Sequence, residues 1–189
     1  MSETQILPHL FALAGPAGAG KTTAADYLVR RHGYIRLKFA DPLKDMLRAI
    51  GLTEAEIEGD LKEVPSKRLC GQSPRWAMQA LGTEWGRRCI GDRFWVNLWA
   101  ARAGSVFAHG GRVVVDDCRF LNEAEAIRHE GGIIVGLTGR GGITGGHESE
   151  RVPISADTVV ANDGSVALLE SHLEGVLARW SERARQRRA

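Results

Sequence analysis

A short segment near the amino terminus combines glycines, a lysine and a threonine at a spacing that can bind phosphate. Its residues, Gly15-Pro16-Ala17-Gly18-Ala19-Gly20-Lys21-Thr22, match the pattern GxxxxGK[ST]. Glycines let successive backbone N–H groups turn toward one phosphate, and the N-terminal dipole of a following helix adds to that attraction. The pattern predicts nucleotide contacts from Gly15, Ala17, Gly18, Ala19, Gly20, Lys21, Thr22 and Thr23, with Lys21 on the β- and γ-phosphates. A plain glycine-rich turn is the alternative interpretation.

A pair of carboxylates follows a run of valines in the second half of the chain. Val113, Val114 and Val115 indicate a buried strand, and Asp116 and Asp117 come directly after it. Together with the Thr22 hydroxyl, these carboxylates are predicted to hold Mg²⁺ directly or through water. A helix cap is the alternative, and the sequence leaves open which aspartate serves the metal.

Phosphoryl transfer also requires cations around the migrating group. Arg119 lies two residues beyond the aspartate pair, where the end of a strand would direct it toward the site. We therefore predict Lys21 and Arg119 as catalytic residues, followed by Arg75 and Arg140. The glycine-rich segment 138–151 is predicted to be a lid, with a surface loop as the alternative.

Strands and helices are expected to alternate along the chain, and this alternation would position the phosphate-binding segment and the aspartates. Strands are expected at 9–14, 34–39, 110–117, 132–137 and 158–161, and helices at 20–31, 41–50, 73–81, 92–103, 122–130 and 165–185. Such alternation favours an α/β protein, a three-layer α/β/α fold with a mostly parallel five-stranded sheet.

Length and composition limit the class of protein. At 189 residues and roughly 150 residues per domain, we expect one domain over 1–189. The 43% hydrophobic and 25% charged residues exclude a disordered chain. Cys70, Cys89 and Cys118 form no CxxC pair, which indicates reduced thiols in a cytoplasmic protein. The early apolar stretch is broken by Gly15 and Pro16, so no membrane span or partner is expected.

The net charge of +2 originates at the carboxyl end. Residues 179–189 contain Arg179, Arg183, Arg185, Arg187 and Arg188 against Glu182 alone. Cations suit the C-terminal end of a helix because of its dipole, and that is the favoured interpretation. The same arginines are the single hint of a nucleic-acid partner, which we do not otherwise expect.

Several further strings occur in an order that resembles one known family. They are Phe39-Ala40-Asp41-Pro42-Leu43-Lys44, Ser73-Pro74-Arg75, Leu81-Gly82-Thr83-Glu84-Trp85-Gly86-Arg87, Asp117-Cys118-Arg119-Phe120-Leu121-Asn122-Glu123 and His147-Glu148-Ser149-Glu150. Together with the P-loop they look like the deoxynucleoside monophosphate kinases of phages. Two positions depart from that pattern: Asp116 replaces a small polar residue, and Leu121 replaces a frequent proline.

The resemblance implies the P-loop kinase fold and an ATP- and Mg²⁺-dependent enzyme of deoxynucleotide biosynthesis. It would transfer the γ-phosphoryl group of ATP to a deoxynucleoside 5′-monophosphate. Asn162 would lie near the adenine ring, and a segment at about 53–104 would cover the acceptor. The residues expected to bind the acceptor are Asp41, Lys44, Arg75, Gln79, Thr83, Glu84, Arg87, Trp95, Asp117, Arg119, Glu123 and His147.

Three other functions are alternatives to this one. In a kinase that acts on a sugar hydroxyl, as the dephospho-coenzyme A kinases do, Asp41 would be the general base. A GTPase is excluded because no N-K-x-D string is present. A non-catalytic nucleotide-binding protein stays open, as do the oligomeric state, with a homodimer as one prospect, and the preferred base and sugar.

Overall fold

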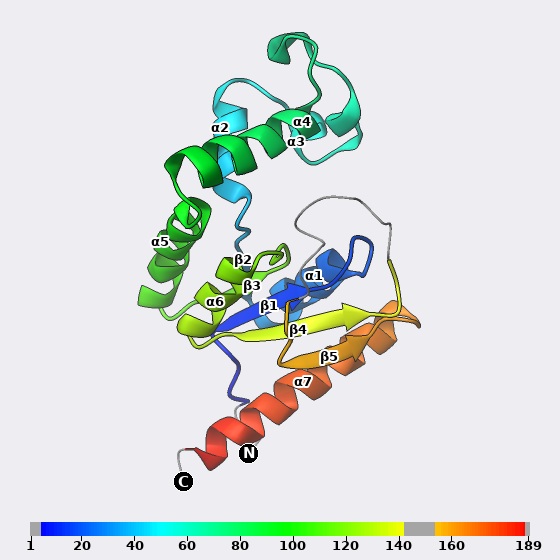
Figure 1. Ribbon diagram of the computed structural model, residues 1–189. Helices are drawn as coiled ribbons and strands as arrows, with labels where there is room; N and C mark the ends of the chain where they lie inside the picture. The colour runs from blue at the N-terminus through cyan, green and yellow to red at the C-terminus, as the bar shows by residue number, and fades with distance from the viewer. Residues whose placement is uncertain (1–4, 142–153, 188–189) are drawn as a thin grey trace. The chain divides into compact units, whose positions relative to one another are not determined.

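The computed structural model describes residues 5–141 and 154–187 (Figure 1). The chain divides into two compact units. Unit 1 lies within Met1–Lys38 and Arg102–Ala189, and unit 2 is Phe39–Ala101. Unit 2 is therefore an insertion between two segments of unit 1. The single domain over 1–189 stays a prediction.

Unit 1 is built on a five-stranded sheet. The strand order is β2 (Tyr34–Arg36), β3 (Arg112–Val115), β1 (Leu10–Ala14), β4 (Ile133–Thr138) and β5 (Thr158–Ala161). Every neighbouring pair is parallel, so all strands end at the same edge. The predicted parallel sheet is confirmed, and the order reverses direction at β1, where α/β folds bind ligands beyond the carboxyl ends of their strands.

Helices cover both faces of this sheet (Figure 1). Along β1 the side chains alternate, and Phe11 and Leu13 pack in a core with α1 (Lys21–His32) and α7 (Val166–Gln186). On the other face, α6 (Leu121–His129) contacts β4, and Leu10 and Ile127 both approach Gly132. This arrangement is the expected three-layer α/β/α fold.

Unit 2 consists of helical segments. They are α2 (Asp41–Ala49), α3 (Glu54–Ile57), η1 (Asp60–Glu63), η2 (Lys67–Leu69), α4 (Pro74–Gln79), the π-helix η3 (Ala80–Ile90) and the first part of α5 (Phe94–Ala108). Leu43, Leu47, Leu52, Ile57 and Trp95 form a buried core of their own. Unit 2 therefore has the hydrophobic centre of a separately packed body.

Four predicted elements differ from the structure by three or more residues, and one of them is the strand expected at 110–117, which spans Arg112–Val115. The strand expected at 34–39 ends at Arg36, because the sheet ladder stops after Leu37 N–H donates to Val114, and Phe39 packs on Trp99 in unit 2. The helix expected at 92–103 runs to Ala108, since it tolerates Gly104 and ends before Gly110 at φ +70°. The helix after Ser73 continues as η3, which sequence periodicity does not reveal.

Within the described part of the chain, no helix has the length and apolar character needed to cross a bilayer.

Candidate active site

The phosphate-binding pattern lies between the end of β1 and the start of α1. Gly20 precedes α1 in a left-handed conformation and, as a glycine, has no side chain to cap the helix, and the first turn of α1 contains no acidic residue. The first N–H groups of α1 are thus left for another acceptor. Gly15 has φ +141°, and a Cβ there would lie 2.6 Å from the Leu137 carbonyl oxygen. Glycine is therefore required at this position, and the strand–loop–helix context of a P-loop is present.

Lys21 and Asn162 both contact this loop. The Lys21 Nζ donates to the carbonyl oxygens of Gly15 and Pro16, each at 2.7 Å. Asn162, just after β5, is 6% exposed, and its Nδ2 donates to the Ala19 carbonyl at 2.9 Å. The ammonium of Lys21 thus lies where the loop closes on itself. Asn162 supports the loop through this hydrogen bond. Its contact with the adenine ring stays a prediction.

The carboxylates expected at the end of β3 lie at the edge of the sheet where the P-loop begins. β3 is the direct neighbour of β1, with Val115 opposite Ala12 in the parallel register. Asp116 is buried at 5% exposure, whereas Asp117 is half-buried. Because parallel strands end together, both aspartates follow a strand adjacent to the one that carries the phosphate loop.

Arg119 and Glu123 occupy the turn into α6. The Glu123 carboxylate accepts from the backbone N–H groups of Arg119 at 2.8 Å and Phe120 at 3.1 Å, and it is 3% exposed. Glu123 therefore caps α6 and fixes the turn. The Arg119 side chain is exposed, and within 5–141 and 154–187 its guanidinium has no ion-pair partner. The backbone of Arg119 is thus fixed by Glu123, while its side-chain cation is available to a ligand.

The residues present fit a Mg²⁺ ion bound together with a nucleotide. The Asp116 Oδ1 atom is buried without a hydrogen-bond partner in the described chain, so it can accept from a metal-bound water or ligate directly. Mg²⁺ usually combines one or two carboxylates with substrate phosphates and waters. No group of three or more His, Cys, Asp and Glu residues outside 142–153 and the chain ends could hold a metal alone. Thr22, Asp116 and Asp117 remain the predicted metal residues.

Two further predictions concern the segment after β4. Arg140 is exposed, and its guanidinium donates to the Gly164 carbonyl. Of the expected lid, only 138–141 is described, and His147 lies outside the described residues. The lid and the role of His147 therefore stay predictions.

Unit 2 carries eight of the residues expected to bind the acceptor: Asp41, Lys44, Arg75, Gln79, Thr83, Glu84, Arg87 and Trp95. Three of their side chains are cations held by carboxylates. Lys44 contacts Glu58 at 2.5 Å, Arg75 contacts Glu63 at 2.8 Å, and Arg87 lies 3.5 Å from Asp92. The Arg75–Glu63 pair is exposed on both sides, so exchanging its carboxylate for a phosphate would cost little.

Lys62 is a cation in unit 2 that the sequence did not single out. Its Nζ lies 3.5 Å from Glu58, the carboxylate that also holds Lys44. Burial lowers the pKa of Lys62, and the charges of Lys44 and Arg75 lower it further, against the opposing effect of Glu58. Burial is the largest cause of the lowered pKa, and the contributions of Lys44 and Arg75 indicate that these two cations lie near Lys62 in unit 2.

Trp95 has a structural role that was not foreseen. It is 2% exposed, and its indole N–H donates to the Gly82 carbonyl at 2.8 Å. The ring packs against Phe94 at 4.7 Å and Trp85 at 6.2 Å between centroids. Trp95 thus anchors η3, and its expected contact with the acceptor stays a prediction.

Two basic residues at the end of β2 were also missed by sequence reasoning. Arg36 Nε lies 3.8 Å from Asp116 Oδ2, and Lys38 Nζ lies 4.0 Å from Asp116 Oδ1. A signal existed, because both lie in the strand predicted at 34–39, whose carboxyl end meets those of its parallel neighbours at one edge of the sheet.

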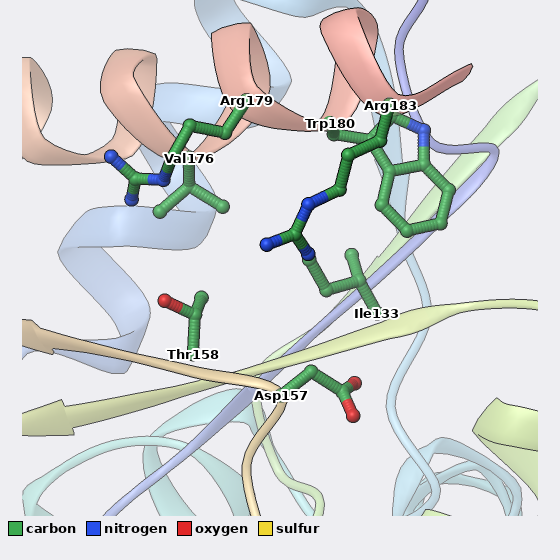
Figure 2. Close-up of a pocket in the computed structure, with 7 residues that line it drawn as sticks. All are labelled: Ile133, Asp157, Thr158, Val176, Arg179, Trp180 and Arg183. Carbon is green, nitrogen blue, oxygen red and sulfur yellow. The ribbon is translucent and has the colours of Figure 1, made fainter. Parts of the chain in front are cut away.

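A pocket of about 100 Å³ lies at the opposite edge of the sheet (Figure 2). Ile133 and Thr158, the first residues of β4 and β5, line it together with Arg179 and Arg183 of α7. Because it adjoins the amino ends of these strands, it is separate from the P-loop edge. Arg179, Arg183 and Arg185 lie on α7, and Arg187 directly follows it. This agrees with the prediction that the C-terminal arginines occupy the end of a helix.

The chain is similar to known proteins over most of its length. No protein-family model matches the chain. A protein of Acanthamoeba polyphaga mimivirus, named "Putative deoxynucleotide monophosphate kinase", is 34% identical over 179 residues, which cover 83% of this chain and 90% of the relative. Among solved structures, an APS kinase of Mycobacterium tuberculosis aligns over 90% of this chain and 97% of its own, with 15% identity and a TM-score of 0.42.

Proposed function

Since the chain belongs to the deoxynucleotide monophosphate kinase family, we propose that it transfers the γ-phosphoryl group of ATP to a deoxynucleoside 5′-monophosphate. The products are ADP and the deoxynucleoside diphosphate. The observation that carries the proposal is the uncapped start of α1 behind the P-loop, at a sheet edge that also presents Asp116 and Asp117. This edge combines donors for phosphates with carboxylates for their cation.

On the donor side, backbone N–H groups of the P-loop and the first turn of α1 hold the phosphates of ATP. Lys21 exchanges its present bonds to the Gly15 and Pro16 carbonyls for the β- and γ-phosphates. Thr22, with Asp116 or Asp117, would hold Mg²⁺, which neutralises phosphate charge when bound. The γ-phosphoryl group is thereby oriented toward the acceptor.

On the acceptor side, the attacking group is a phosphate oxygen that already carries negative charge. No strong general base is needed, so positioning and charge neutralisation carry the catalysis. Arg119 supplies a cation on the turn after β3 that has no ion-pair partner within residues 5–141 and 154–187, and Arg140, which now donates to the Gly164 carbonyl, supplies a second cation after β4. Asp117 and Glu123 complete the proposed acceptor residues of unit 1.

Unit 2 supplies the remaining acceptor contacts in this proposal. Lys44, Arg75 and Arg87 are the cations available for the 5′-phosphate, with Asp41, Gln79, Thr83 and Glu84 as polar groups for the base and sugar. Asp41 lies in the first turn of α2, and its use as a general base belongs to the hydroxyl-acceptor alternative.

The test is an acceptor panel. ADP formation from ATP and Mg²⁺ is measured with each deoxynucleoside monophosphate, each ribonucleoside monophosphate, dephospho-coenzyme A and no acceptor. We expect turnover that depends on a deoxynucleoside monophosphate and matches diphosphate formation. Turnover with dephospho-coenzyme A alone would support the hydroxyl-acceptor alternative. Acceptor-independent hydrolysis, or none at all, would overturn the proposal.

A further inference from the structure

Arg36, the last residue of β2, contacts two elements of the proposed nucleotide site. Its Nη2 donates to the Thr22 carbonyl at 3.0 Å and to Asp26 Oδ1 at 2.6 Å, both on α1. Its Nε lies 3.8 Å from Asp116 Oδ2 after β3. One guanidinium therefore joins the first turns of α1 to the carboxylate at the end of the neighbouring strand.

The buried carboxylate of Asp116 depends on Arg36 for much of its charge compensation. The Asp116 side chain is 3% exposed, and the Arg36 side chain 23%. Both Arg36 Nε and Asp116 Oδ1 are buried and lack hydrogen-bond partners in the described parts of the chain. The carboxylate is thus held by the charges of Arg36 and Lys38, and no close hydrogen bond occupies Oδ1. Removing one partner of a buried ion pair is strongly destabilising, because the other charge is then left buried without compensation.

The two groups proposed to meet the magnesium ion come from different elements. The Thr22 hydroxyl belongs to α1 and the Asp116 carboxylate follows β3, so their separation depends on how α1 is fastened to the sheet. Arg36 donates a hydrogen bond to the backbone carbonyl of Thr22 and forms an ion pair with the carboxylate of Asp116. Its planar guanidinium can face both partners at once, which a lysine ammonium cannot do in the same geometry.

We propose that Arg36 is a positioning residue that keeps Thr22 and Asp116 in register for Mg²⁺–nucleotide binding. This inference rests on the proposed function only in requiring a nucleotide bound with Mg²⁺ at the P-loop. It does not depend on the identity of the acceptor. The competing explanation is that Arg36 merely stabilises the edge of the sheet.

The test compares ATP binding with and without the metal. Calorimetric titration of ATP is performed in Mg²⁺ and in EDTA for the wild type, Arg36→Ala, Arg36→Lys and Arg30→Ala. Arg30 is the matched control, because it lies on α1, is largely exposed and pairs with Glu170 on α7. Loss of a partner that orients metal ligands typically weakens binding by roughly 10–100-fold. We expect a loss of that size for Arg36→Ala in Mg²⁺, a much smaller one in EDTA, and partial recovery in Arg36→Lys.

Asp26 provides a second variant that leaves the arginine in place. Asp26→Asn removes the charge that holds the Arg36 Nη2 group, so it should weaken Mg²⁺-dependent binding less than Arg36→Ala does. The double variant should bind as Arg36→Ala does, because the two side chains act as one unit. Should Arg36→Ala be too unstable to measure, Arg36→Lys and Asp26→Asn carry the same comparison.

Equal weakening in Mg²⁺ and EDTA, or unchanged binding with a lower Tm, would overturn the positioning role of Arg36. A wild type that binds ATP with Mg²⁺ but phosphorylates no deoxynucleoside monophosphate would refute the proposed function and leave this inference standing. A wild type with no ATP binding under either condition would refute both.

Discussion

The Asn162 side-chain amide donates to the Ala19 carbonyl oxygen at 2.9 Å, joining the P-loop to a residue 143 positions later in the chain. Both residues are buried. The last strand of the sheet therefore helps to fix the loop that follows the first strand. Through this bond the conformation of the P-loop depends on completion of the fold.

Replacing Asn162 tests this bond. Asn162→Ala leaves the buried Ala19 carbonyl without its donor, which should lower the free energy of unfolding by about 1–3 kcal/mol. Chemical denaturation measures the change. Asn97→Ala on the exposed side of α5 is the control, and we expect it to stay within about 0.5 kcal/mol of the wild type. Equal stability of the two variants would contradict a supporting role for Asn162.

Lys21→Ala tests the phosphate loop. The substitution removes the cation that contacts the loop carbonyls at 2.7 Å and that would contact the γ-phosphate. Turnover should fall on the order of 100-fold or more, with the Tm close to that of the wild type. Steady-state ADP formation checks the rate, and circular dichroism checks the fold. A variant with near-normal turnover would remove Lys21 from the proposed mechanism.

Arg119→Ala tests the acceptor side. Its guanidinium has no ion-pair partner among the residues that the structure describes, whereas its backbone N–H donates to Glu123. The side chain can therefore be removed without disturbing the turn. We expect acceptor-dependent turnover to fall on the order of 100-fold and the Kd for ATP to change little. Unchanged kinetics would show that the acceptor phosphate lies elsewhere.

The contact between α1 and α7 predicts a pH-dependent stability. Glu174 accepts from Tyr27 at 2.5 Å and interacts with His32 at 2.6 Å. Burial raises the pKa of Glu174, but the bonds from Tyr27 and His32 lower it more, so the pKa lies below its ordinary value of 4.5. A lowered folded-state pKa contributes stability that is complete above the unfolded value and is lost as pH falls through the folded one.

Glu174→Gln should accordingly reduce stability by about 1 kcal/mol near pH 7. The difference from the wild type should shrink as the pH falls below 4.5. Urea unfolding across this pH range measures it. Glu170→Gln, on the same helix and paired with Arg30 at 3.4 Å, is the control for removing a carboxylate from α7. A difference that grows on acidification would contradict the lowered pKa.

Thiol labelling provides a test of burial next to the aspartate pair. Cys118 is 2% exposed, and burial raises its pKa well above the ordinary range, whereas Cys70 and Cys89 are exposed. Because the thiolate is the reactive form, a disulfide-exchange reagent should label Cys70 and Cys89 quickly and Cys118 only on unfolding. Three rapidly labelled thiols would contradict the packing of the turn after β3.

Local patterns were sufficient to predict the sheet and the phosphate loop. The run from Val113 to Val115 and the apolar stretch before Gly15 are strands because they are buried on both faces. The glycines of the P-loop are required by backbone geometry that leaves little choice of residue, as the approach of Gly15 to Leu137 shows. Features of this kind are encoded within a few neighbouring residues.

Contacts between residues far apart in the sequence were harder to predict. Arg36 was missed because its significance depends on Asp116, whose approach follows from the pairing of β2 with β3. The role of Trp95 in anchoring η3 was missed, since nothing in its neighbours shows that its indole N–H reaches the Gly82 carbonyl. The π-helix η3 has no periodic pattern distinct from an α-helix.

The insertion of unit 2 also has a consequence for how the chain folds. Pairing of Arg36 with Val114 closes a loop that contains all of unit 2, whereas β4 and β5 are separated by a shorter stretch. Loop closure costs entropy that grows with the length of flexible chain enclosed. Prior collapse of unit 2 around its own core would shorten that chain and lower the entropic cost of pairing β2 with β3, so substitutions that weaken the core of unit 2 should slow assembly of the sheet.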